Sequence, residues 1–585
     1  MSSPDTSQAN RLWAGLIVEE LVRNGIDFFC VAPGSRSTPL VAAIAENPKA
    51  RSLVHFDERG TAFAALGYAR ATGRPAAWIT TSGTAVANGL PAVVEASVDG
   101  VPMILLTADR PPELRQTGAN QTIDQPDIFG DFVRWRFDLP APDLSIDPAM
   151  VLTTVDQAAY RTSRAPSGPV HLNLMFREPF FSDTEEAWDS NDSIPNSWRG
   201  SGEPYTRYAA TKSSVDRVEI ERLWDALRPA KRGLVVAGRL ASRKQGEAVA
   251  RLAETLGWPL LPDIGSQVRL GSGTTVSYYD ALLSSEAFAD GHEPEAVIQV
   301  GGRALSKRLE QFVVRSRPHP YVVVRDNPFR LDPGHMVTHS VEAEIVSFCA
   351  ALVEAIGERS SDETTWTSGW REASEEAGRY LDGLLFGEAE LSEPLVARVV
   401  SRHVPEDHGL VLASSMPVRD VDAFAAVDGP PVPVAANRGA SGIDGTVATA
   451  AGFARGLERP VTLVIGDLAL LHDLNSLALL RETPVIVVAV NNDGGGIFNF
   501  LPVSGQKAFF EPYFGTPQGV GFGDAAKMFG LGYEQPRTAE EFLEAYRAAC
   551  SSGESAIIEV RTDREENVAL HRRILAGITA GSSLE

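Results

Sequence analysis

The chain has 585 residues, of which 44% are hydrophobic, and its 76 acidic and 53 basic residues give a formal net charge of −23. This length suffices for about three to four domains of common size, and the negative charge argues against binding to nucleic acid through bulk electrostatics. No stretch approaches the ~20 consecutive apolar residues of a membrane span.

The sequence also gives no indication of a signal peptide, of disulfide bonds or of a metal site made of cysteines. The first residues, MSSPDTSQANRLW, carry neither the basic start nor the apolar core of a signal peptide, so a cytoplasmic location is predicted. The three cysteines, Cys30, Cys349 and Cys550, lie far apart and form no C-x-x-C pair. This spacing argues against a disulfide framework or a cysteine metal site.

Residues 1–190 alternate between helical and strand patterns. The predicted elements are a helix over 12–26, a strand over 27–34, a helix over 38–46, a strand over 52–56, a helix over 60–73, and strands over 76–81 and 101–109. Short apolar strands that alternate with helices predict a parallel, doubly wound α/β sheet.

Two further α/β units follow along the chain. A polar stretch rich in turn-forming residues predicts a linker over 191–214, and a charged helical connection is predicted over 357–390. They separate a central unit, 215–356, from a third unit, 391–585. The strands predicted in these two units cover 233–238, 296–302 and 320–326, then 409–414, 461–467, 484–492 and 555–560.

Oxygen-bearing residues follow two strands of the third unit. One strand ends at Gly466 and Asp467, and the other ends at Asn491 and Asn492, just before glycines 494–496. Parallel strands bring such residues to the same carboxyl edge of a sheet, where α/β folds bind ligands. Carboxylate and amide oxygens suit Mg²⁺, which commonly shares its coordination shell with phosphate groups and water. The pattern predicts a diphosphate held through a metal ion.

The first unit places charged residues at a strand-to-helix turn. In VHFDERGTAFAALGY (54–68), Glu58 stands between an apolar run and a helix of small residues that is predicted to be buried. A glutamate at a helix N-terminus can serve the helix dipole alone, so this residue by itself does not establish a site.

The Gly-Asp and Asn-Asn pairs of the third unit, separated by 23 residues, resemble the diphosphate-binding motif of thiamine-diphosphate-dependent enzymes. Leu468 departs from the general pattern, which has a third glycine there, but Glu58 stands where this superfamily has the glutamate that contacts the aminopyrimidine ring of its cofactor. The resemblance implies a pyrimidine-binding domain over 1–190, a central α/β domain over 215–356 and a diphosphate-binding domain over 391–585. All three would have the doubly wound α/β fold of the decarboxylase and carboligase type.

Longer stretches are similar to one branch of this superfamily, the synthases of the menaquinone pathway. They are APGSRSTPL (32–40), HFDERGTAFAALG (55–67), TSGTAVANGLPAVVEA (81–96), TADRPPELRQTGANQTIDQ (107–125), ANRGASGIDGT (436–446), GDLALLHDLNSLALL (466–480) and NNDGGGIFNFLP (491–502), with GGRALSKRL (301–309) in the central unit. Leu468 is normal for this branch.

The resemblance implies a reaction and its cofactors. A transferase of this branch decarboxylates 2-oxoglutarate on thiamine diphosphate with Mg²⁺, for which Mn²⁺ can substitute, and adds the succinyl carbanion to isochorismate in a Stetter-like 1,4-addition. A carboxyl group bonded to the pyrimidine ring favours the imino tautomer that removes the C2 proton, and the chemistry itself belongs to the cofactor. Both substrates are dianions, which suit arginine forks.

The resemblance also implies roles for individual residues. Catalytic roles fall to Glu58, Gln121, Ile443 beneath the cofactor, and Phe498 at the reacting centre. Metal ligands are Asp467, Asn492 and the Gly494 carbonyl. The cofactor is bound by Glu58, Ile443, Gly466, Asp467, Leu468, Asn492, Gly494 and Ile497. The substrates are bound by Ser35, Arg36, Arg110, Asn120, Gln121, Lys307, Arg308, Ser415, Arg419 and Arg438. His55 and His472 are expected to be structural or to support these residues.

Because Glu58 and Asp467 fall in different domains, the resemblance implies a homodimer or a dimer of dimers, with the cofactor between the first domain of one subunit and the third domain of its partner. Some relatives are inhibited by a downstream naphthoate at an arginine-rich site, but the basic residues Arg232, Arg239, Arg243 and Lys244 are expected to form a solvated helix face.

Two alternatives remain at this point. A different thiamine-diphosphate carboligase or decarboxylase, such as an acetohydroxyacid synthase, would act on smaller 2-oxo acids and need fewer arginines. A non-catalytic nucleotide-binding protein is suggested by GLVVAGRLASR in the central unit, but neither G-x-G-x-x-G spacing there nor a G-x-x-x-x-G-K-[ST] loop supports it.

Overall fold

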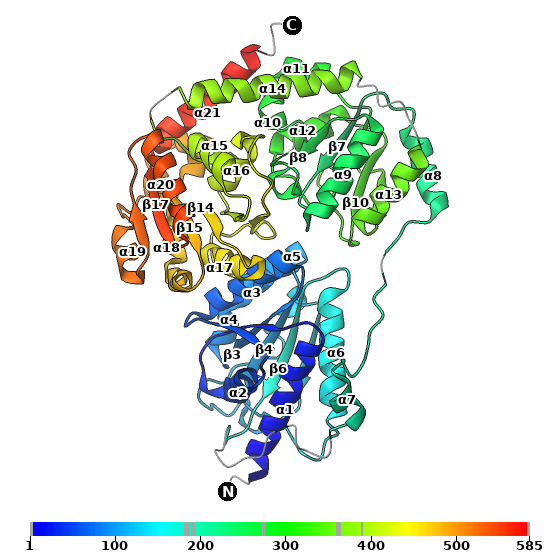
Figure 1. Cartoon of the computed structure of the whole chain (residues 1–585), viewed down its shortest axis with the longest axis vertical. Coiled ribbons are helices and arrows are strands. Elements are labelled where there is room, and N and C mark those ends of the chain that lie inside the picture. The colour runs from blue at the N-terminus through cyan, green and yellow to red at the C-terminus, as the bar shows by residue number, and fades with distance from the viewer. Residues whose placement is uncertain are drawn as a thin grey trace. The chain divides into compact units, whose positions relative to one another are not determined.

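The computed structural model describes residues 4–180, 188, 194–211, 213–271, 273, 275–357, 364–387 and 390–581 (Figure 1). The chain forms two compact units. The first contains residues 1–211, 437–459 and 472–483, and the second contains residues 212–436, 460–471 and 484–585. Each unit is described separately below.

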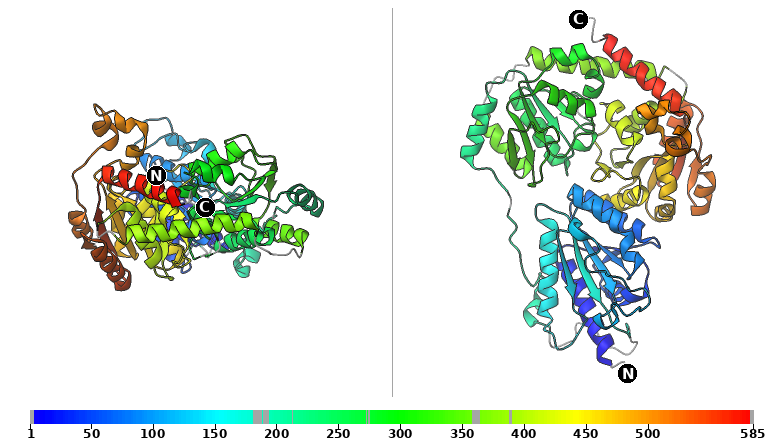
Figure 2. Two further views of the ribbon diagram at one scale, coloured as in Figure 1. Left: turned by 90° about the horizontal axis from the view of Figure 1, so that it is seen from above. Right: turned by 180° about the vertical axis from the view of Figure 1, so that it is seen from behind.

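The first unit is built on a sheet of six parallel strands in the order β2-β1-β3-β4-β6-β5. The strands are β1 Phe28–Val31, β2 Arg51–Val54, β3 Ala76–Thr80, β4 Met103–Asp109, β5 Trp135–Leu139 and β6 Pro169–Met175. The accompanying helices are α1 Pro4–Arg23, α2 Thr38–Glu46, α3 Glu58–Thr72, α4 Thr84–Asn88, α5 Leu90–Asp99, α6 Ala149–Ser163 and α7 Asn196–Ser201. Every residue of β4 and β6 is buried, as expected for central strands covered by helices on both faces (Figure 2).

The second unit contains two parallel sheets. The five-stranded sheet has the order β11-β10-β9-β7-β8, and the six-stranded sheet has the order β13-β12-β14-β15-β17-β16. The strands of the first are β7 Gly233–Ala237, β8 Leu260–Pro262, β9 Ala296–Val300, β10 Tyr321–Arg325 and β11 His339–Glu342. Those of the second are β12 Gly409–Leu412, β13 Val434–Ala436, β14 Val461–Gly466, β15 Val485–Asn491, β16 Gly532–Glu534 and β17 Ala556–Arg561. These sheets confirm the predicted class of three doubly wound α/β domains.

Helices alternate with these strands in sequence. In the central part they are α8 Arg217–Leu227, α9 Arg243–Leu256, α10 Tyr279–Leu282, α11 Glu286–Gly291, α12 Lys307–Ser316 and α13 Ile345–Ile356, followed by α14 Thr365–Leu385 within the predicted helical connection. The later helices are α15 Glu393–His403, α16 Met416–Phe424, α17 Thr446–Leu457, α18 Asp467–His472, α19 Gly523–Phe529, α20 Ala539–Ser552 and α21 Arg564–Gly581. Residues 191–193, 212, 358–363 and 388–389 of the predicted linker and connection lie outside the described residues. The predicted domain boundaries stay a prediction.

Helix α17 belongs to the first unit, although it lies in sequence between β13 and β14 of the third sheet. It packs against α3 with the two backbones in close approach. A Cβ atom on Gly67 would lie 2.1 Å from the carbonyl oxygen of Thr449, and one on Gly452 would lie 1.9 Å from that of Ala64. Small residues are therefore required along this contact, which explains the run of alanine and glycine in α3.

Helix α3 is capped at both of its ends. Asp57 caps α3 by accepting hydrogen bonds from the backbone amides of Arg59 and Gly60, and Gly73 ends this helix in the left-handed conformation at φ 66°. The predicted helix over 60–73 is thus confirmed, with two more residues at its start. Within the described residues, no helix combines the length and apolar character that crossing a membrane requires.

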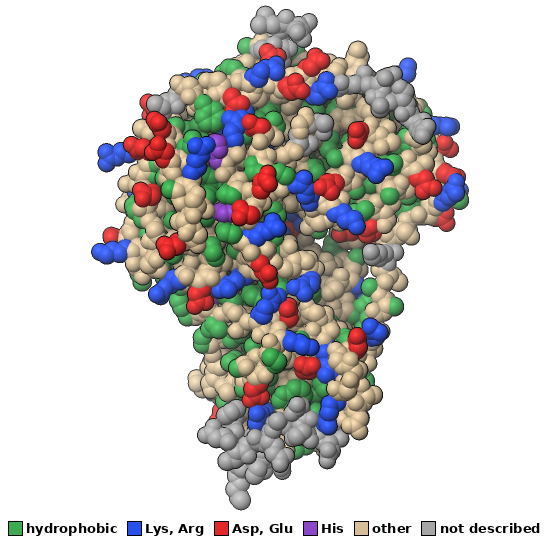
Figure 3. Space-filling model, in the orientation of Figure 1, with side chains coloured by type: hydrophobic (Ala, Val, Ile, Leu, Met, Phe, Trp, Pro, Cys, Tyr) green, Lys and Arg blue, Asp and Glu red, His purple; other side chains and the backbone are tan. Residues whose placement is uncertain are grey.

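Acidic and basic side chains intermingle on the face drawn in Figure 3, so the net charge of −23 is not gathered into one patch there. The three cysteines are free thiols, and Cys30 and Cys349 are buried. Burial raises the pKa of the Cys349 thiol to about 12.

A pH dependence of stability follows from His171 on β6, which is 1% exposed. Burial disfavours the imidazolium and lowers the pKa of His171 from 6.5 to about 4. The unfolded chain therefore binds a proton more readily than the folded chain, and stability is lost as pH falls from 6.5 to 4, by up to about 3 kcal/mol. We expect the thermal midpoint of the wild type to fall more steeply over this range than that of His171→Gln. Parallel curves for the two proteins would contradict this assignment.

Candidate active site

The carboxyl edge of the third sheet carries the predicted metal ligands. Strands β14 and β15 are paired neighbours, with Gly466 opposite Val490. Asp467 begins α18 directly after β14, is 6% exposed, and accepts hydrogen bonds from the amides of Leu468 at 2.8 Å and Gly494 at 2.7 Å. Burial raises the pKa of Asp467 to about 6, because desolvation disfavours the charged carboxylate.

Asn492 follows β15 at the same edge. Its Nδ2 donates to Oε1 of Glu393 at 2.7 Å, whereas its Oδ1 is buried and has no hydrogen-bond partner among the described residues. A buried amide oxygen left without a partner costs free energy, so an unpaired oxygen at this position indicates a ligand group. The sequence identified Asn492 but gave no signal for Glu393, which lies 99 residues away.

Glycines shape the turn after Asn492. Gly494 has φ 139°, and a Cβ atom there would lie 2.0 Å from the carbonyl oxygen of Gly515. A Cβ on Gly496 would lie 2.5 Å from Nδ2 of Asn492. The glycines therefore allow the chain to fold over the asparagine side chain, and only residues without a Cβ fit.

These residues fit a magnesium ion. Asp467, Asn492 and the Gly494 carbonyl offer a carboxylate, an amide oxygen and a backbone oxygen, which is the donor chemistry that Mg²⁺ prefers. The described residues contain no group of three or more His, Cys, Asp or Glu side chains that could hold a metal. A cation bound here by so few protein ligands would need further oxygens from phosphate or water, as a diphosphate supplies.

Other predicted residues of the third domain follow strands of the same sheet, β12 and β15. Ser415, after β12, has a positive φ of 75° and its carbonyl accepts a hydrogen bond from the Arg419 guanidinium. A positive φ outside glycine is strained and is often found at functional sites. Phe498 packs edge-on against Phe514, with ring centroids 5.4 Å apart, and Ile497 precedes it in the same short 3₁₀ helix, Gly496–Phe500.

In the first unit, the structure brings several predicted substrate-binding residues to the carboxyl edge of the sheet. Arg110 follows β4 and donates to the Ser82 hydroxyl, and Gln121 donates to the Ser82 carbonyl at 2.8 Å. Arg36 follows β1, is 6% exposed, and donates to the Phe176 carbonyl at 2.8 Å. Burial and the nearby charge of Arg110 lower the pKa of Arg36. Glu178 pairs with Arg36 at 3.2 Å, and a further anion beside the two guanidinium groups would also offset their repulsion.

Other predicted residues of this unit are more exposed. Ser35 and Asn120 are exposed, and Gln121 adopts a positive φ of 59°. Glu58 is the first residue of α3, is half-buried, and accepts a hydrogen bond from Asn88 at 3.3 Å. The carboxylate therefore lies at the exposed carboxyl edge of β2 rather than inside the core.

A buried ion-pair cluster holds the loop that carries Arg438 and Ile443. Glu95, 3% exposed, accepts hydrogen bonds from the backbone amides of Gly439, Ala440 and Ser441 at 2.8, 2.6 and 3.3 Å. Arg70 pairs with Glu95 at 2.7 Å and also with Asp99. Sequence reasoning missed Glu95, because 344 residues separate it from Gly439 and no local pattern marks the pair.

Removing the Glu95 carboxylate is expected to destabilise the first unit. In Glu95→Ala, three backbone amides lose their acceptor and the buried Arg70 guanidinium loses one of its two carboxylate partners, and breaking a buried pair in this way costs about 3–5 kcal/mol. Urea unfolding followed by tryptophan fluorescence would measure the loss. Glu482→Ala is the matched control, because Glu482 is 87% exposed and forms only a surface pair with Arg455. Equal midpoints for the two variants would show that Glu95 does not anchor the loop.

In the central domain, most of the predicted basic residues are exposed or form ion pairs with nearby carboxylates. Lys307 is exposed at the start of α12, and Arg308 pairs with Asp280 at 2.5 Å. Arg232 and Arg243 pair with Glu295 and Glu247. The structure therefore balances Arg308, Arg232 and Arg243 with local carboxylates, as is usual for a solvated surface.

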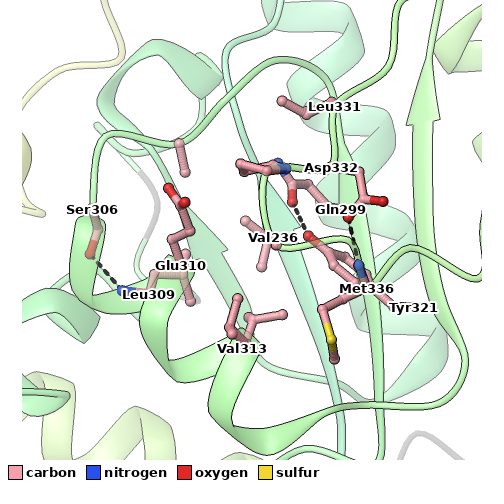
Figure 4. Close-up of a pocket in the computed structure, with 14 residues that line it drawn as sticks. Val236, Gln299, Ser306, Leu309, Glu310, Val313, Tyr321, Leu331, Asp332 and Met336 are labelled. Atoms are coloured by element: carbon pink, nitrogen blue, oxygen red, sulfur yellow. Dashed lines mark hydrogen bonds between the residues drawn. The ribbon is translucent and has the colours of Figure 1, made fainter.

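A small cavity of about 50 Å³ lies between α12 and the central sheet (Figure 4). No lysine or arginine lines it, and its polar side chains pair with protein groups: Tyr321 donates to Gln299 at 2.6 Å, and Asp332 accepts from the Met336 amide at 2.7 Å. This lining does not suit a dianion. The predicted site residues do not line the cavity either.

Both histidines considered from the sequence contact the protein itself. His55 is 3% exposed, and burial lowers its pKa. Nδ1 of His472 lies 3.3 Å from the Arg59 guanidinium, and the His472 carbonyl accepts a hydrogen bond from the same guanidinium at 2.9 Å. A structural role for both is in keeping with these contacts.

Three sequence-family models match most of the chain. Residues 13–128 match "Thiamine pyrophosphate enzyme, N-terminal TPP binding domain", residues 192–412 match "Middle domain of thiamine pyrophosphate", and residues 428–560 match "Thiamine pyrophosphate enzyme, C-terminal TPP binding domain". The candidate metal ligands fall within the third match.

Curated proteins similar to this chain share one name, 2-succinyl-5-enolpyruvyl-6-hydroxy-3-cyclohexene-1-carboxylate synthase. The protein from Rubrobacter xylanophilus is 65% identical over 98% of this chain and 99% of its own length. The one from Salinibacter ruber is 54% identical over 98% of this chain and 97% of its own length. The one from Chlorobium phaeobacteroides is 45% identical over 97% and 98%.

Proposed function

Because this chain belongs to the family of 2-succinyl-5-enolpyruvyl-6-hydroxy-3-cyclohexene-1-carboxylate synthases, we propose that its geometry serves that reaction in menaquinone biosynthesis. It is a thiamine-diphosphate-dependent transferase that removes CO₂ from 2-oxoglutarate and adds the remaining succinyl unit to isochorismate. The observation that supports the site most directly is the edge formed by Asp467, Asn492 and Gly494, where a buried amide oxygen has no hydrogen-bond partner among the described residues.

The third domain holds the cofactor through a divalent cation. Asp467, Asn492 and the Gly494 carbonyl would bind Mg²⁺, or Mn²⁺ in its place, and the cation would neutralise the diphosphate. Gly466, Leu468 and Ile497 lie beside these ligands in sequence and would contact the cofactor. When bound, thiamine diphosphate supplies an acidic carbon that adds to the 2-oxo acid and accepts the charge left by CO₂.

Proton transfer begins at Glu58. Its carboxyl group would bond to the pyrimidine ring and exchange a proton there, as general acid–base catalysis requires. Ile443 would support the cofactor from beneath, on the loop held by Glu95. Phe498 and Gln121 would pack and orient the substrates at the reacting carbon.

Arginines recognise the dianionic substrates. Arg36 and Arg110 are buried beside each other at the edge of the first sheet, and a bidentate carboxylate would relieve their repulsion. Ser35, Asn120, Ser415, Arg419, Arg438, Lys307 and Arg308 would complete the substrate-binding surface.

Assembly and location are part of the same proposal. Glu58 and Asp467 belong to different units, and we propose a homodimer or a dimer of dimers in which one subunit's Glu58 serves its partner's Asp467, in the cytoplasm. Sedimentation velocity at working concentration should give a dimer or larger species. A fully active monomer would contradict this arrangement.

An omission experiment tests the function. Isochorismate consumption would be followed by absorbance with the protein, thiamine diphosphate, Mg²⁺ and 2-oxoglutarate, each left out in turn. Consumption that needs all four components is the expected result. If isochorismate persists while CO₂ is still released, isochorismate is not the acceptor substrate. Turnover of pyruvate that does not respond to isochorismate would favour an acetohydroxyacid synthase activity instead.

A further inference from the structure

A buried carboxylate lies behind the candidate metal site. Glu393 is the first residue of α15, is 3% exposed, and accepts hydrogen bonds through Oε1 from Asn492 at 2.7 Å and from the Thr562 hydroxyl at 3.3 Å. Asn492 and Thr562 directly follow the neighbouring strands β15 and β17. Glu393 thus connects the start of one helix to the carboxyl ends of two strands.

The direction of the hydrogen bond decides how the asparagine is oriented. An asparagine side chain has one oxygen and one NH₂ group, and a rotation of 180° exchanges them. Oε1 of Glu393 accepts a hydrogen bond from the NH₂ group of Asn492, so the amide oxygen is turned away from Glu393 and is buried with no partner in the described part of the chain. If the amide were reversed, two acceptor oxygens would face each other and an NH₂ group would face the cation.

Other groups keep Glu393 in place. Ser392 caps α15 by accepting from the Leu395 amide, which fixes the first turn of the helix. Asp420 is a neighbour of Glu393, and burial together with this carboxylate raises the pKa of Glu393 to about 8. Asp420 Oδ1 in turn lies 3.3 Å from Nε2 of His571 on α21. These buried carboxylates carry a desolvation cost, and a role for Glu393 in ordering the site gives a reason for their presence.

We propose that Glu393 is a positioning residue for the divalent cation, which acts by holding the Asn492 amide with its oxygen toward the metal. This inference rests on the proposed function, because it takes Asn492 as a metal ligand. Partners that orient metal ligands typically change metal affinity by about 10–100-fold when they are removed. Glu393 touches neither the cation nor the reacting atoms in this account.

Metal affinity measured without turnover tests the proposal. Binding of Mn²⁺ would be followed by the electron paramagnetic resonance signal of the free ion, in the presence of saturating thiamine diphosphate. Glu393→Leu removes the acceptor and should weaken Mn²⁺ binding by about 10–100-fold. Glu393→Gln keeps an oxygen that can accept from Asn492 and should stay within about threefold of the wild type. Glu393→Asp keeps a carboxyl group but withdraws the acceptor, and should fall between the two.

Controls separate this role from a general effect on folding. Thr562→Val removes the other hydrogen bond to Glu393 and should leave Mn²⁺ affinity unchanged, and urea unfolding of each metal-free variant shows whether the unit is intact. If Glu393→Leu does not fold, the comparison of the glutamine and aspartate variants still decides the question. The proposal would be overturned if Glu393→Asp or Glu393→Leu bound Mn²⁺ with wild-type affinity. A large loss of Mn²⁺ affinity in Glu393→Gln would overturn it as well. If Asp467→Ala binds Mn²⁺ as tightly as the wild type does, the metal site itself is misassigned, and the inference about Glu393 fails with it.

Discussion

Glu58→Gln is expected to lower kcat by about 10²–10⁴-fold while the fold and cofactor binding persist, because removing a proton-transfer partner typically costs this much. Glutamine keeps the size and the contact with Asn88 but cannot exchange a proton with the pyrimidine ring. Steady-state assays give kcat, and exchange of the cofactor's C2 proton for deuterium, followed by proton resonance after an acid quench, isolates the affected step.

Glu46→Gln serves as the control for this variant. Glu46 is an exposed glutamate of the same unit, at the end of α2, and pairs with Arg11 at 3.0 Å. Its rate should stay within about twofold of the wild type, as expected for a surface substitution. A Glu58→Gln enzyme with normal kcat and normal C2 exchange would remove Glu58 from the mechanism.

Asp467→Ala is expected to act through affinity rather than through chemistry. The variant loses the carboxylate ligand and the acceptor of the Gly494 amide, so the concentrations of Mg²⁺ and thiamine diphosphate needed for half-maximal activity should rise by at least about 100-fold, above the effect of an indirect partner. Excess of both should restore part of kcat. Titrations of each component, with tryptophan fluorescence as a binding signal, measure the change.

The matched control is Asp524→Ala, which removes an exposed carboxylate of the same unit. Its cofactor and metal dependence should equal that of the wild type. If Asp467→Ala showed normal half-saturation but a low kcat that excess cofactor did not restore, the carboxylate would have a role other than holding the cation.

The fold and the metal edge could be predicted because their signals are local. Strands such as β15 are continuous apolar runs, and the ligands Asp467 and Asn492 stand directly where β14 and β15 end. The edge strand β5, Trp135–Leu139, was not predicted, since its three middle residues are exposed and two of them, Arg136 and Asp138, are charged. Strand β13 has three residues and gives no periodicity at all.

The supporting residues could not be predicted for a different reason. Glu95 and the loop 439–441 are joined by folding across more than 300 residues, and Glu393 reaches Asn492 across 99. A glutamate in an amphipathic helix usually faces solvent, so its burial becomes visible only when the partners are in place. The sequence therefore identifies the residues that contact ligands, but not the residues that orient those ligand-binding residues.

The assignment of α17 to the first unit has a consequence for how the protein can be divided. Because residues 437–459 and 472–483 belong to that unit, the polypeptide passes between the two units five times along its length. A fragment that ends near residue 190 would lack the helix that covers Gly67 and the small residues of α3, leaving an apolar strip exposed to self-association. Cutting the gene at the boundaries of its sequence families would thus separate pieces that fold together, and proteolytic nicks should leave the halves associated instead of releasing independent modules.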